Sequence, residues 1–99
     1  MIVVLTAEAE IDLETIAQYI ARDSLTTALS VVHELREKCL ALNEAPRGYP
    51  LVPRYEHHGI RRRPSGSYLI FYRVGTETIE VVHILHGARD YERLLFPEG

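Results

Sequence analysis

The stretch GIRRRPSGSYLIFYRV, residues 59–74, decides the fold. It contains two runs rich in β-branched, aromatic and other apolar residues on either side of Pro64-Ser65-Gly66, a sequence typical of a tight turn. We therefore predict strands over residues 59–63 and 67–74 that pair as an antiparallel hairpin. A further strand-like run, residues 78–85, follows a glycine-containing turn and extends the hairpin into a three-stranded meander.

The strand predicted over residues 67–74 carries large apolar side chains on both faces. Because successive residues of a strand point to opposite sides, one face holds Leu69, Phe71 and Arg73 and the other holds Tyr68, Ile70, Tyr72 and Val74. A strand of this kind is expected in the middle of a sheet that is covered on one side and partly covered on the other.

Two helices are predicted before the meander. A short apolar strand at residues 2–5 leads to Thr6, whose hydroxyl can cap a helix, and apolar residues then recur at helical spacing over residues 7–22. Asp23-Ser24 offers a second cap for a helix over residues 25–43. Because the joint is so short, we expect the two helices to form an antiparallel hairpin over a shared core.

The remaining segments complete the predicted architecture. Three prolines and a glycine within residues 46–53 indicate an extended surface loop, and residues 91–96 indicate a short C-terminal helix or turn. The fold class is therefore α+β with the order β-α-α-β-β-β, a helical hairpin packed on a mostly antiparallel sheet. With 99 residues, the chain is expected to form a single domain, residues 1–99.

The composition narrows the function. The formal net charge is −3, whereas a protein that grips phosphates is usually basic, so we expect no direct DNA binding by the chain alone. No apolar run approaches membrane-spanning length, and no export signal is evident, so we expect a cytoplasmic protein. Cys39 is the only cysteine and is interpreted as a small buried apolar residue rather than a reactive thiol.

Taken together, these segments resemble the ParE family of the RelE/ParE toxin superfamily. The resemblance is carried by residues 59–74, by ILHGARD at residues 84–90, and by the acidic opening TAEAEIDLETI at residues 6–16. It runs over most of the chain and implies the RelE/ParE fold. It also implies a toxin of a type II toxin–antitoxin pair and a ParD-like antitoxin whose C-terminal segment wraps over the toxin.

The superfamily includes two mechanisms, which must be separated by residues. ParE members inhibit DNA gyrase, whereas RelE members cut messenger RNA on the ribosome. The nucleases commonly carry an arginine before the Leu-Val-Tyr stretch of the central strand, and here Leu69 occupies that position. Leucine cannot hold or polarise a phosphate, so the substitution favours a gyrase inhibitor that acts by binding.

An endoribonuclease remains the alternative, and metal-free RNA cleavage needs a proton acceptor, a proton donor and cations. The candidates are Arg61, Arg73 and His86. The simpler interpretation of His86 is that it builds a fixed turn with Arg89 and Asp90, through side-chain hydrogen bonds and an ion pair. We expect the same three turn residues to be structural or to contact the target.

The arginines suggest a place for the antitoxin. Residues 61–63 are predicted on an edge strand, and an exposed edge flanked by positive charge suits the addition of an extended acidic segment. The residues assigned to antitoxin binding are Arg61, Arg63, Tyr68 and Arg73. We expect no cofactor and no metal, since His57 and His58 have no partners at metal-ligand spacing. A third alternative is an inactive toxin-like module that only binds antitoxin.

Overall fold

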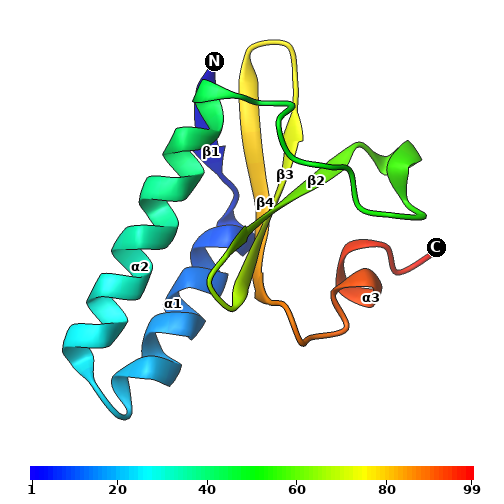
Figure 1. Cartoon of the computed structure of the whole chain (residues 1–99). Helices are drawn as coiled ribbons and strands as arrows, with labels where there is room; N and C mark the ends of the chain where they lie inside the picture. The colour runs from blue at the N-terminus through cyan, green and yellow to red at the C-terminus, as the bar shows by residue number, and fades with distance from the viewer.

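The computed structural model describes all 99 residues. Two long helices pack on one face of a four-stranded sheet, and a short helix near the C-terminus lies on the other side (Figure 1). The elements in chain order are β1 (Ile2–Leu5), α1 (Ala7–Ala21), α2 (Leu25–Leu40), β2 (Ile60–Ser65), β3 (Tyr68–Val74), β4 (Thr78–His86) and α3 (Tyr91–Leu95). The predicted α+β architecture is confirmed. No helix is both long and apolar enough to cross a membrane.

The sheet has the order β1-β4-β3-β2. The three C-terminal strands form the predicted antiparallel meander, whereas β1 pairs with β4 in parallel. The ladder between β3 and β4 shifts register at Phe71 and Tyr72, where Val82 is the extra residue. β1 ends at Leu5, opposite Val81, so the last five residues of β4 extend beyond it.

Both predicted helix caps form. The hydroxyl of Thr6 accepts the N–H of Ala9 at 3.1 Å, and Ser24 accepts the N–H of Thr27 at the same distance. α2 ends at Leu40, three residues earlier than predicted, because the chain tightens into a 3₁₀ turn over Ala41–Glu44.

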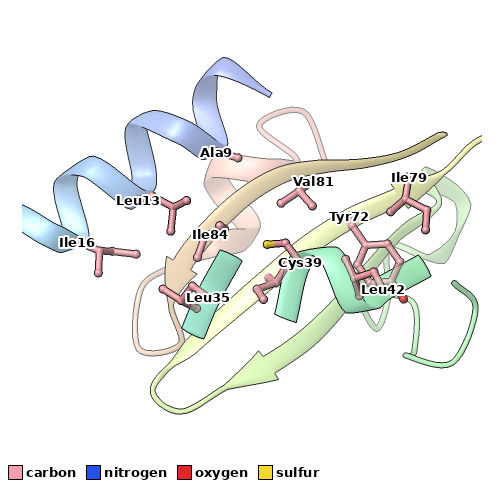
Figure 2. Packing of buried hydrophobic residues seen from close by; sticks show 11 residues of the cluster. Ala9, Leu13, Ile16, Leu35, Cys39, Leu42, Tyr72, Ile79, Val81 and Ile84 are labelled. Atoms are coloured by element: carbon pink, nitrogen blue, oxygen red, sulfur yellow. The ribbon is translucent and has the colours of Figure 1, made fainter. Parts of the chain in front are cut away.

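The sheet separates two apolar clusters. The larger one lies between the helical hairpin and the sheet, where Leu13, Leu35 and Tyr72 are almost fully buried (Figure 2). The smaller cluster lies on the opposite face and consists of Val52, Ile60, Phe71, Leu85 and Phe96. Alternation along β3 supplies residues to both clusters, as the sequence predicted for a strand in the middle of the sheet.

The segment between α2 and β2 is more deeply packed than the predicted surface loop. Val52 is fully buried, and the ring of Tyr55 stacks on Phe96 at a centroid distance of 4.3 Å. Arg54 adopts a positive φ of 73° and donates to both carboxylate oxygens of Glu92 at 2.9 and 3.1 Å. The loop and the α3 segment therefore cover the second face of the sheet together.

Candidate functional site

The arginines of β2 point to alternate sides of the sheet and bind the chain itself. Arg61 donates to the carbonyl of Tyr49 at 2.8 Å, and Arg63 donates to the carbonyl of Lys38 at 2.9 Å. The Arg63 guanidinium also lies 5.0 Å from the centre of the Tyr49 ring. Arg62, on the opposite face, donates to the hydroxyl of Tyr91. These cations fasten a loop, a helix end and α3 to the sheet.

The edge of β2 differs from the exposed template predicted for the antitoxin. The N–H of Val52 donates to the Ile60 carbonyl at 2.9 Å, and the N–H of Arg62 donates to the Pro50 carbonyl at 3.0 Å. The next residue whose N–H would face outward is Pro64, which has none. The preceding loop and a proline thus block strand addition along β2, and the expectation of an open edge at residues 61–63 was wrong.

Arg73 lies on the face opposite the helical hairpin. It pairs with Glu80 across the β3–β4 ladder, with a nitrogen–oxygen distance of 3.6 Å. Both side chains are about half exposed. An exposed pair of this kind adds little stability, but it neutralises the positive charge predicted to attract a partner.

The three candidates for RNA cleavage do not form one site. Arg61 faces the helical hairpin, whereas Arg73 faces the other side of the sheet. His86 pairs with Tyr68, five residues from Arg73 along β3, which corresponds to roughly 17 Å. A single phosphate cannot contact all three side chains.

His86 builds the turn that follows β4. Its Nδ1 accepts the N–H of Ala88 at 3.0 Å, and its carbonyl accepts the N–H of Arg89 at the same distance. The acceptor role of Nδ1 places the ring proton of neutral His86 on Nε2. The hydrogen-bonded part of the predicted turn is present. The predicted ion pair is different, because Oδ2 of Asp90 lies 3.6 Å from Nε of Arg93 and Asp90 forms no ion pair with Arg89.

Three of the predicted residues meet at a cavity. Tyr68, His86 and Arg89 line a cavity of about 470 Å³ between α1 and the end of the sheet. The rings of Tyr68 and His86 meet edge to face at a centroid distance of 5.5 Å. The other wall is the face of α1 that carries Asp12, Thr15, Ile16 and Tyr19, and Ser67, Ile84 and Leu85 complete the lining. This cavity is the candidate functional site.

Asp12 is the residue of this site that the sequence did not indicate. Its Oδ2 lies 2.8 Å from Nδ1 of His83 and accepts the N–H of Ile84 at 2.9 Å. His83 is partly buried and holds α1 against β4 through this contact. Asp12 is only 16% exposed at its side chain, but an acidic residue in an amphipathic helix gives no signal in the sequence that its partner lies 72 residues away.

The fold and a family match define the class of protein. A helical hairpin on one face of a four-stranded sheet, with β1 parallel to β4 and a three-stranded meander, is the RelE/ParE-like toxin fold. The family model described as the ParE toxin of type II toxin–antitoxin system, parDE, matches residues 3–91. The chain therefore belongs to the ParE toxin family of type II toxin–antitoxin systems.

Solved structures agree on the fold. The chromosomal ParDE toxin–antitoxin system from P. aeruginosa contains a chain with a TM-score of 0.72 and 22% identity, covering 87% of this chain and 95% of that one. The toxin–antitoxin complex RelBE2 from Mycobacterium tuberculosis contains a chain with a TM-score of 0.55 and 23% identity, covering 86% and 95%. No curated protein matches the chain by sequence.

Proposed function

We propose that the chain is a cytoplasmic toxin that inhibits DNA gyrase through protein–protein contacts and is neutralised by a ParD-like antitoxin. Its membership in the ParE family supports the pairing with an antitoxin. On this proposal the toxin binds the topoisomerase and holds it on cut DNA, so the DNA break is made by gyrase.

The disposition of the arginines is the observation that carries the binding mode. Arg61 and Arg63 donate to carbonyls of their own chain, and Arg73 is paired with Glu80. A ribonuclease needs cations preorganised around one phosphate, whereas these side chains lie on two faces and are already bonded. Leu69 adds a leucine where the nucleases of the superfamily commonly carry an arginine. Inhibition by contact requires no such convergence.

A supercoiling assay with purified gyrase tests the proposal. Saturating toxin should stop supercoiling of relaxed plasmid and should accumulate cleaved plasmid after detergent and protease treatment. Premixing the toxin with the antitoxin encoded beside it should restore supercoiling. Full gyrase activity at saturating toxin would contradict the gyrase target.

A ribosome assay tests the alternative with the same protein preparation. Translating ribosomes with a defined message are incubated with toxin, and cleavage is mapped by primer extension. We expect no toxin-dependent cuts. Codon-specific cuts that disappear in His86→Ala would replace the proposed function with ribosome-dependent cleavage. Growth that continues after induction without antitoxin, together with a retained antitoxin complex, would identify an inactive binding module.

A further inference from the structure

The first strand of the chain, β1, forms a free edge of the sheet. In the order β1-β4-β3-β2, β4 pairs with one side of β1 and no strand lies on its other side. At the opposite edge of the sheet, the loop that precedes β2 bonds to the outer side of that strand. The two edges therefore differ, and β1 is the one that has room for a further strand.

The backbone groups of Val3 and Leu5 point away from the sheet. The N–H groups of Ile2 and Thr6 donate to carbonyls on the β4 side at 3.1 and 3.0 Å. Because backbone groups alternate between the two sides of a strand, the residues between them face outward in turn. No loop, turn or side chain bonds the N–H or the carbonyl of Val3 or Leu5. Neither residue is fully buried, so these groups are accessible to a partner.

The side chains beside this edge are apolar and exposed. Val3 and Leu5 pack toward the helical hairpin, so Ile2 and Val4 lie on the opposite face, where they are 68% and 45% exposed. β1 contains no charged residue and no proline, and its pairing with β4 has no bulge. Edge strands that avoid pairing with another chain usually carry such features. In β1 only the length of four residues limits pairing.

We propose that β1 pairs in the antiparallel direction with β1 of a second copy of this chain. The product is a two-fold symmetric dimer in which one continuous sheet runs through both copies. The inference goes beyond the proposed function, because it requires neither an antitoxin nor gyrase. The choice of a second copy rests on the self-complementary spacing of the outward groups on β1.

That spacing determines the register. Val3 and Leu5 lie symmetrically on either side of Val4, so a two-fold axis at Val4 places Val3 of each copy opposite Leu5 of the other. Residues opposed in this way exchange both of their backbone hydrogen bonds. Every outward N–H and carbonyl of both strands is then bonded. An axis at Val3 or Leu5 would instead set the other residue against Met1 or Ala7, which lie outside β1.

The same register covers the exposed apolar side chains. The two copies of Val4 meet at the axis as a directly opposed pair, with Cα atoms about 4.5 Å apart. Ile2 of each copy lies diagonally next to Val4 of the other, within reach of a cross-strand contact. No charged side chain lies on β1, so no like charges on the two strands oppose each other. Because each copy contributes a single short strand, the dimer is weak and its population depends on concentration.

Sedimentation velocity of the toxin without antitoxin tests the association. The mean mass should rise from monomer toward dimer between about 1 µM and about 500 µM. Val4→Lys should stay monomeric, because two ammonium groups would meet at the axis, whereas Glu80, its neighbour on β4, accommodates the lysine within each copy. Ile11→Lys is the matched control and should dimerise like the wild type, since Ile11 is an even more exposed apolar residue, on α1. A wild-type toxin that stays monomeric throughout would overturn this inference and leave the proposed function intact.

A disulfide tests the register. A Cα separation of about 4.5 Å lies within the range that a disulfide spans, so Val4→Cys should form a covalent dimer under mild oxidation. Ile2→Cys is the control, because residue 2 is more exposed than residue 4 but its two copies lie roughly 14 Å apart in this register. Cys39 is buried and does not compete. Linkage of both variants at equal rates would overturn the assigned pairing.

Amide exchange separates a second copy from a different partner. The Val3 N–H should exchange more slowly as the toxin concentration rises, whereas the Val4 N–H, which faces β4, should change little. Protection of Val3 that appears only when antitoxin is added, in a toxin that is otherwise monomeric, would assign this edge to the antitoxin. That result would also overturn the inference.

Discussion

The Asp12 carboxylate accepts the backbone N–H of Ile84 at 2.9 Å across 72 residues of chain. The contact occurs where β1 has ended and β4 continues, so a side chain of α1 supplies the acceptor that a strand would otherwise provide. The same oxygen lies 2.8 Å from His83. Asp12 therefore links α1 to β4 and forms part of the cavity wall.

Removing this acceptor should destabilise the fold. Asp12→Ala leaves the N–H of buried Ile84 without a partner, and we expect a loss of about 1–3 kcal/mol in the free energy of unfolding. Asp12→Asn keeps an oxygen acceptor and should lose less. Urea unfolding followed by circular dichroism measures both, with Glu14→Ala as an exposed control on the same helix. A loss in Asp12→Ala no larger than in Glu14→Ala would show that the bond contributes nothing.

Arg63 should stabilise the C-terminal end of α2. Its guanidinium donates to the Lys38 carbonyl, one of the last four carbonyls that the helix itself leaves unpaired, and its charge opposes the negative end of the helix dipole. Arg63→Ala should lower the free energy of unfolding by about 1–2 kcal/mol. It should also speed amide exchange in the turn after Leu40. Arg93→Ala, an exposed arginine, should leave both measurements nearly unchanged.

The hydrogen bonds that Arg61 and Arg63 donate to backbone carbonyls limit what variants of the β2 arginines can reveal about binding. Charge reversal at Arg61 and Arg63 would place carboxylates against the carbonyls of Tyr49 and Lys38. We expect these variants to be destabilised, so weaker antitoxin binding by them would not identify a contact surface. Arg89 makes no such side-chain hydrogen bond, so a change in binding on charge reversal there would not have this second explanation.

Local patterns in the sequence were sufficient for the elements. The cap at Thr6 and the two apolar faces around Phe71 depend on neighbours within a few residues, and both are confirmed. The hairpin is also present, but its turn lies at residues 66–67 and not at 64–66, because Pro64 and Ser65 still pair with β3. The covered edge of β2 was not predictable because Pro50 and Pro53 on either side of Leu51 and Val52 indicate a loop, and a loop-forming pattern does not reveal backbone bonds to a distant strand. Asp12 was missed because its partners lie on the last strand of the sheet.

Tyr72 should make stability sensitive to alkaline pH. Burial raises the pKa of its hydroxyl above the ordinary value of 10, so the folded protein keeps a proton that the unfolded chain loses. The stability that this pKa difference contributes is fully present below pH 10 and is lost as the pH rises toward the pKa of the folded state. The free energy of unfolding should therefore fall above about pH 10.

The variant Tyr72→Phe separates this effect from that of the other tyrosines. It removes the hydrogen bond to the Pro46 carbonyl, which is 2.8 Å long, so about 1 kcal/mol should be lost at neutral pH. The alkaline decline should become shallower, because phenylalanine has no proton to lose. Tyr19→Phe, at an exposed position, should retain the full decline. Parallel curves for wild type and Tyr72→Phe would contradict the assignment.

Cys39 should report global unfolding rather than local chemistry. The side chain is fully buried in the cluster beneath the helical hairpin, and burial raises the pKa of its thiol to about 12 (Figure 2). At pH 7 the thiolate fraction is then about one in 10⁵, and no reagent reaches the sulfur without opening of the core.

Labelling by a maleimide should be very slow in the native protein and should accelerate in urea in step with the loss of circular dichroism. Asp12→Ala should label faster than wild type, by the factor that its lost free energy of unfolding implies through the opening equilibrium, because labelling and unfolding open the same core. Native labelling at the rate of a free thiol would show instead that α2 separates from the sheet without global unfolding.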